Sequence, residues 1–304
     1  IIDSSGAHAT LLPNGATFNN LDVDTGSGHD VQLQENLTIV GTLDLTGSTD
    51  NWIMNANGAA GDVTLTMGSS TASGTIESDT ADLFRLNPHS SGNCIIQGAS
   101  TLYPCNVTGQ DWKWDYGSGA APTQLANMNF QVAVDTHTSG SNAVNIELTG
   151  DCEFDAVTVS SGDTLDLNGQ RAVFGGLLTN AGTIDYDGLV FLDAGINDDG
   201  SVANTASCKM IFSTNTGSTD TPASVGLVMI NHPSFATSFT GQRFGTTHII
   251  GSGENRLAGA TSSVTDLTVA TGGTLNDNST GGTITCAGDF TTSGGLIGKS
   301  AYDF

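Results

Sequence analysis

Glycines recur at short, even intervals through residues 154–200, and this spacing constrains the fold more than any other feature of the chain. They include positions 162, 169, 176, 182, 188, 195 and 200, and short runs of alternating apolar and polar residues separate them. Runs such as Val157–Val159 and Leu165–Leu167 are typical of half-buried β-strands, because successive side chains of a strand point to opposite faces. Glycine accepts the positive φ that a tight corner requires. Three such sides make a coil of about 20 residues, so the stretch predicts a parallel β-helix, or β-solenoid.

The same pattern returns at residues 17–47 and 263–298, which makes it an internal repeat. One nine-residue template, apolar-x-x-apolar-x-apolar-x-x-Gly, fits residues 18–26, 154–162 and 264–272. Apolar residues form 37% of the chain and charged residues only 12%, so it lacks the high charge of disordered chains. Its 40 glycines supply many corners. We therefore expect an ordered all-β protein.

Residues 87–125 interrupt this pattern. They divide the expected N-terminal coils (1–86) from the C-terminal coils (126–304) of one continuous, elongated domain. The segment holds three prolines and an aromatic run, and we expect an irregular loop or small hairpin that leaves the solenoid wall. Insertions on one face of a solenoid often carry binding sites. Three rings are candidates for binding carbohydrate or a partner protein, unless they pack against the solenoid or a neighbouring subunit: Trp112, Trp114 and Tyr116.

Five cysteines occur without the spacing of a metal site. There is no C-x-x-C and no nearby Cys/His cluster, which argues against zinc. Cys94 and Cys105 are candidates for a disulfide that closes a small loop. Cys152, Cys208 and Cys286 are expected inside the coils as small apolar residues.

The charge balance excludes some partners. Seven Lys plus Arg stand against 31 Asp plus Glu, a net charge of −24, which disfavours binding to nucleic acid or anionic lipid. No run approaches the ~18 apolar residues of a membrane helix, so we expect no membrane insertion. High negative charge suits an exterior surface.

Aspartates cluster where corners are expected, and three interpretations remain open for them. Stacked coils would bring Asp166 and Asp187 close together, as Ca²⁺ ligands or as a glycosidase pair. We name four candidate Ca²⁺ ligands: Asp185, Asp187, Asp198 and Asp199. A catalytic reading would use Asp166, Asp187 or Asp193, and the third reading is that these carboxylates are solvated corners. Apart from Ca²⁺ we expect no cofactor, and we assign no catalytic residue.

The segments 36–43 and 154–165 resemble repeats in β-helical fibre, tailspike and virion-surface proteins of bacteriophages. They are also similar to the coils of large secreted bacterial adhesins. The resemblance implies an elongated exterior structural protein that is often trimeric, and no catalytic residue carries over.

We therefore expect a structural and interaction protein on the exterior of a virus particle, as a fibre, spike or capsid decoration. Its expected partners are further copies of itself, in a trimer or repeating assembly, other virion or surface proteins, and glycans. One alternative is a secreted or cell-surface bacterial adhesin or filament subunit. The other is a β-helical enzyme or module that cleaves or binds glycans.

Overall fold

The computed structural model divides the chain into two compact units, Ile1–Gln170 and Arg171–Phe304. Each unit is described by itself. The residues that the structure describes are 8–23, 30–46, 52–55, 61–79, 84–87, 92–110, 112–116, 122–136, 143–192, 196–198, 200–203, 209–212, 227–230, 237–239, 243–244, 246–249, 254–257, 262–264, 266–272, 274–276 and 284–297.

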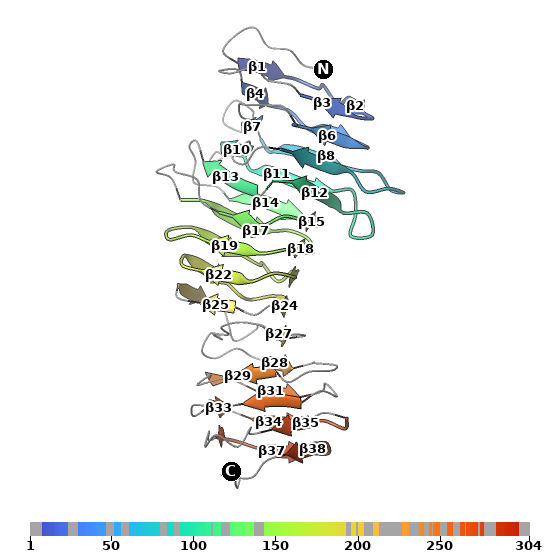
Figure 1. The fold of residues 1–304 in the computed structure, drawn as a ribbon. Coiled ribbons are helices and arrows are strands. Elements are labelled where there is room, and N and C mark those ends of the chain that lie inside the picture. Colours follow the sequence, from blue (N-terminus) through green and yellow to red (C-terminus); the bar gives the residue numbers. More distant parts are fainter. Residues whose placement is uncertain are drawn as a thin grey trace. The chain divides into compact units, whose positions relative to one another are not determined.

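The first unit is built of three parallel sheets, each of which takes one strand from every coil (Figure 1). Sheet 1 runs β1 (His8–Leu11), β4 (Asp30–Leu33), β7 (Trp52–Asn55), β10 (Phe84–Asn87), β13 (Trp112–Tyr116), β16 (Val134–Asp135) and β19 (Val157–Val159). Sheet 2 runs β2 (Thr17–Phe18), β5 (Leu37–Ile39), β8 (Val63–Met67), β11 (Cys94–Gly98), β14 (Thr123–Ala126), β17 (Asn145–Leu148) and β20 (Thr164–Asp166). Sheet 3 runs β3 (Leu21–Asp22), β6 (Thr42–Asp44), β9 (Thr75–Ser78), β12 (Cys105–Gly109), β15 (Met128–Phe130) and β18 (Cys152–Phe154).

The second unit has a long parallel sheet and shorter ones. The long sheet runs β21 (Arg171–Phe174), β24 (Leu189–Leu192), β27 (Lys209–Phe212), β28 (Leu227–Ile230), β31 (Thr246–Ile249), β34 (Leu267–Val269) and β37 (Phe290–Thr292). The shorter sheets contain β22 (Leu178–Asn180) with β25 (Ile196–Asp198); β23 (Thr183–Asp185) with β26 (Ser201–Ala203); β29 (Thr237–Phe239), β32 (Glu254–Leu257), β35 (Thr274–Asn276) and β38 (Gly295–Ile297); and β30 (Arg243–Phe244), β33 (Ser262–Val264) and β36 (Ile284–Cys286).

The expected parallel β-solenoid is confirmed, and so is its coil length of about 20 residues. Arg171 pairs with Leu189, and Leu189 with Lys209, in a parallel register that advances 18 and then 20 residues. The coil that joins Trp52 to Phe84 is longer, at 32 residues. Strand pairing therefore stays regular while the corners between strands absorb the extra length.

The core of the first unit lies between its three sheets and is filled by inward side chains of the strands whose burial the structure describes. In β8, for example, Val63, Leu65 and Met67 are 0% exposed and the threonines between them are not buried. Aromatic residues at paired positions of neighbouring strands stack on one another, as Phe130 and Phe154 do at a ring-centroid separation of 5.2 Å. Burial of these side chains is the main stabilising term of the fold.

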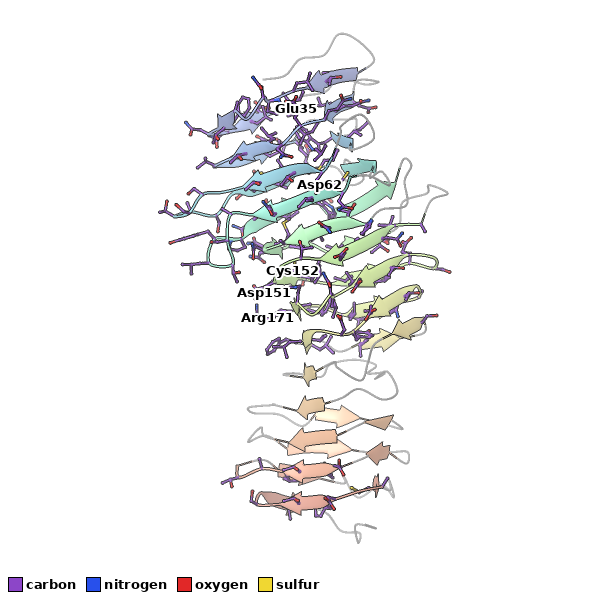
Figure 2. All side chains as sticks on the ribbon, turned by 180° about the vertical axis from the view of Figure 1, so that it is seen from behind. Glu35, Asp62, Asp151, Cys152 and Arg171 are labelled. Atoms are coloured by element: carbon purple, nitrogen blue, oxygen red, sulfur yellow. The ribbon has the colours of Figure 1, made fainter. Side chains whose placement is uncertain are left out.

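Corner residues connect successive coils where the strand ladders end. The backbone N–H of Thr42 donates to Asn20 Oδ1 at 2.9 Å, 22 residues earlier in the chain. In the same way the N–H of Asn93 donates to Asp62 Oδ1 at 2.8 Å (Figure 2). A corner N–H has no strand partner, and Asn and Asp side chains supply the acceptor that it requires.

Two details of the sequence interpretation require correction. The described parts of residues 87–125 do not form an irregular excursion: β11, β12 and β14 pair in register with strands on either side. The three copies of the nine-residue template also do not all occupy the same position within a coil. The first copy spans β2 and β3, the second β18 and β19, and the third β33 and β34, so the template encodes a corner followed by a strand.

Candidate functional site

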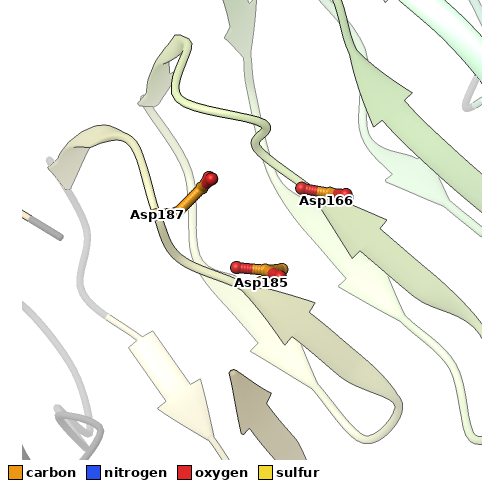
Figure 3. Close-up of side chains that lie close together, drawn as sticks. All are labelled: Asp166, Asp185 and Asp187. Atoms are coloured by element: carbon orange, nitrogen blue, oxygen red, sulfur yellow. The ribbon is translucent and has the colours of Figure 1, made fainter. Parts of the chain in front are cut away.

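Two of the predicted metal ligands, Asp185 and Asp187, lie together in the second unit. Asp185 ends β23, and Asp187 stands in the corner before β24 (Figure 3). Tyr186 between them is 0% exposed, so strand alternation directs both carboxylates away from the core. Both side chains are half-buried, and each places a carboxylate oxygen within 4.8 Å of the other's. Asp166, also drawn in Figure 3, ends β20 of the first unit.

This pair supplies part of what a calcium ion needs. Ca²⁺ takes six to eight oxygen ligands, so two carboxylates would have to be joined by further oxygens. Of the other predicted ligands, Asp198 lies on β25 but its side chain is outside the described residues, and Asp199 is outside them altogether. Asp193, the third carboxylate of the catalytic reading, is also outside them. Calcium binding therefore stays a prediction.

Other corner aspartates hold the fold together, which the sequence interpretation missed. Asp163, another corner aspartate of the same stretch, is 1% exposed. Its Oδ2 accepts from Thr136 Oγ1 at 2.6 Å, and its Oδ1 accepts from the backbone N–H of Val144 at 2.9 Å. Thr136 Oγ1 in turn accepts from the N–H of Ser160 at 3.0 Å. This network joins the coil of β16 to the coil of β19 and β20, so Asp163 belongs to the structure of the solenoid.

The aromatic run lies on β13 and is not a loop. Trp112 is only 5% exposed and packs edge-on against Phe130, with ring centroids 6.0 Å apart. A ring buried in this way is not available to stack on a sugar, so the binding role predicted for Trp112 is wrong. The side chains of Trp114 and Tyr116 lie outside the described residues, and their role stays a prediction.

The proposed disulfide is also wrong. Cys94 lies on β11 of sheet 2 and Cys105 on β12 of sheet 3, and both carry thiols that are 0% exposed. The Cys94 thiol donates to the backbone oxygen of Met54 at 3.3 Å. Cys152 is a buried thiol, as expected; burial raises its pKa to about 12 and also raises the pKa of Cys105. These thiols are inert packing residues, because the reactive thiolate is suppressed. Cys286 is only half-buried, and Cys208 is outside the described residues.

Comparison with known proteins adds no assignment. No protein-family model, curated protein or solved structure matches this chain. Within the described part of the chain, no helix has the length and apolarity that a membrane crossing requires. The function must therefore be argued from the chain's own residues.

A second feature that the sequence interpretation missed lies at the start of the second unit. The strands β21 and β24 read Arg-Ala-Val-Phe and Leu-Val-Phe-Leu, with apolar residues at both the buried and the partly exposed positions. A continuous apolar run in a strand is the signal that would have found it, because such runs are typical of sheets covered on both faces.

Proposed function

We propose that this protein is a structural and interaction component of the exterior of a virus particle, as a fibre, spike or capsid decoration. One observation carries the proposal. The carboxylates that the structure describes at several corners accept backbone N–H groups of neighbouring coils, as Asp62, Asp163 and Asp266 do. Carboxylates at these corners thus hold successive coils together.

The composition supports the same proposal. A solenoid whose coils are joined by strand ladders and corner hydrogen bonds is extended by adding coils, which suits a spacer or fibre. A net charge of −24 keeps such a surface soluble and repels nucleic acid and anionic membranes. Further copies of the chain, other virion or surface proteins and glycans are the partners that this role implies.

Quantitative mass spectrometry of purified particles tests the proposal. We expect the protein at a fixed copy number per particle, retained through gradient purification and a high-salt wash. A preparation in which the protein occurs free and monomeric in the culture fluid, and is absent from particles, would refute it.

The same protein preparation separates this role from a catalytic one. We expect incubation with a panel of acidic and neutral polysaccharides to yield no new reducing or unsaturated ends. Product formation that is lost in an Asp187→Asn variant would instead support the glycan-cleaving alternative.

A further inference from the structure

The outer face of sheet 3 in the first unit is polar, as expected for a sheet that faces water. Its outward positions on successive strands carry polar side chains that are half-buried or exposed: Asp22, Asp44, Glu77, Asn106, Asn129 and Glu153. Residues that pair across these strands interact, as Asn129 Nδ2 donates to Asn106 Oδ1 at 3.0 Å. These outward residues set the reference for a solvated outer face in this chain.

At β21 and β24 the outer face of the long sheet in the second unit is apolar instead. On β21 and β24 the inward residues are 0% exposed, for example Phe174 and Leu192, as a core requires. The outward residues of the same strands are only half-buried: Val173, Leu189 and Phe191. We call these three side chains, with Arg171, the apolar strip. Leaving apolar side chains partly in water forgoes roughly 25 cal/mol for each Å² that a covering surface would bury.

The strand register relates the positions of the strip to positions on β27 and β28, which follow β24 in the sheet (Figure 1). Positions 209 and 227 pair along the row of Leu189, and positions 211 and 229 along the row of Phe191. The residues at these positions are Lys, Leu, Ile and Met. The row of Phe191 thus stays apolar in sequence over four successive strands, and the row of Leu189 alternates basic and apolar residues. The matching face of sheet 3 has no apolar residue at the outward positions named above.

Charge indicates what covers the strip. The Arg171 guanidinium lies over the Phe191 ring, 5.3 Å from its centroid, and Figure 2 shows Arg171 at the start of β21. Lys209 occupies a register position in the same row. These are two of only seven basic residues in a chain with 31 acidic ones. A cover that is apolar at its centre and acidic around it would complement these residues, and this chain has such a composition.

We propose that the apolar strip is an interface between copies of this chain, and the proposal deepens the assembly role by naming the surface that assembles. A second copy offers the same apolar rows and an excess of carboxylates that complement Arg171. The chain's own segment between β27 and β28 fits less well, because residues 213–224 are almost all small or polar. Covering apolar rows with apolar rows is how homodimer interfaces are built.

Sedimentation velocity on the purified chain tests the interface across a concentration series. We expect the wild type to self-associate, and we expect Leu189→Thr and Phe191→Thr each to weaken association at least about tenfold, which corresponds to about 1.4 kcal/mol. Threonine keeps the strand preference of the position while removing apolar surface. The matched control is Ile95→Thr, since Ile95 is another half-buried outward residue, on β11. We expect Ile95→Thr to associate like the wild type.

A labelling experiment decides the case if a threonine variant folds poorly. In a Val173→Cys variant, maleimide labelling should be slow in the associated state and should speed up on dilution, whereas Ile95→Cys should label at one rate throughout. A wild type that stays monomeric overturns the proposal. Fast labelling of position 173 would then indicate an open face, and slow labelling would indicate a face covered by the chain's own segment. Cross-linking of position 173 to a different protein in native particles would also overturn it. That result would leave the exterior role intact, so the two proposals fail separately.

Discussion

Replacing Asp163 with alanine is the sharpest test of how the solenoid is held together. The carboxylate is 1% exposed, and it accepts hydrogen bonds from the Thr136 hydroxyl at 2.6 Å and from the Val144 N–H at 2.9 Å. The Asp163→Ala variant leaves both donors buried without that acceptor. Thr136 Oγ1 also accepts from the N–H of Ser160 at 3.0 Å. Removing the Asp163 carboxylate should therefore also weaken the contact between Thr136 and the corner after β19.

The magnitude follows from the number and kind of these bonds. A hydrogen bond to a charged group contributes about 1.5–3 kcal/mol to stability. Two such bonds make Asp163→Ala destabilising by roughly 3–6 kcal/mol, which overlaps the roughly 3–5 kcal/mol seen when one partner of a buried charged pair is removed. Asp163→Asn should cost less, roughly 1–2 kcal/mol, because its amide oxygen still accepts from the Val144 N–H.

Hydrogen exchange is the suitable assay, because each coil of a solenoid contacts only its neighbours and unfolding is not a single two-state step. We expect exchange of the Val144 amide and of the peptide around β17 to speed up about 100-fold or more in Asp163→Ala. Asp155→Ala is the matched control: it removes the same charge from the same stretch, at an exposed corner. If the two variants exchange at similar rates in this peptide, the structural role assigned to Asp163 is refuted.

Three further outcomes are expected. Burial raises the pKa of the Cys152 thiol from 9.0 in the unfolded chain to about 12 in the folded one. The contribution of this thiol to the free energy of unfolding should therefore be fully present below pH 9.0 and fall as the pH rises from 9.0 toward about 12. Urea titrations should show a smaller fall in Cys152→Ala. Gly109→Ala should lower the melting temperature more than Gly162→Ala. Both glycines have positive φ, but only at Gly109 would the new Cβ overlap the Ser78 carbonyl, costing about 1–3 kcal/mol more. If Ca²⁺ binds at Asp187, a chelator should lower the melting temperature of the wild type and leave that of Asp187→Asn unchanged; an unchanged wild-type melt counts against the site.

The fold could be predicted from the sequence because its determinants are local. Alternation at Val157–Val159 and a glycine with φ +94° at position 162 are visible within a few residues, and both are in the structure as expected. Residues 87–125 were misjudged because their three prolines and aromatic run indicated an irregular loop, although the strands among them keep the parallel register. The coils that join Trp52, Phe84 and Trp114 advance 32 and 30 residues while their strands stay in register. Extra residues in a corner lengthen the coil without changing the register of the strands.

The roles of the aspartates could not be predicted, because the partner that decides each role is one coil away. Asp163 binds an N–H 19 residues earlier, and Asp62 one that lies 31 residues later. Asp155, in the same stretch as Asp163, is exposed. A local window contains none of these partners, so a carboxylate that holds two coils together looks the same as one that faces water.

The register of the strands therefore decides which residues share a surface. Once the strands are aligned, the residues of each strand divide into those that face the core and those that face outward, and the two sets can be compared separately. The described inward positions of both units are mostly apolar, as a solenoid core requires. The outward positions differ: Asp44 and Glu77 pair in one unit, Val173 and Phe191 in the other. Since core packing places no demand on outward residues, the apolar pair is the feature from which we propose an interface.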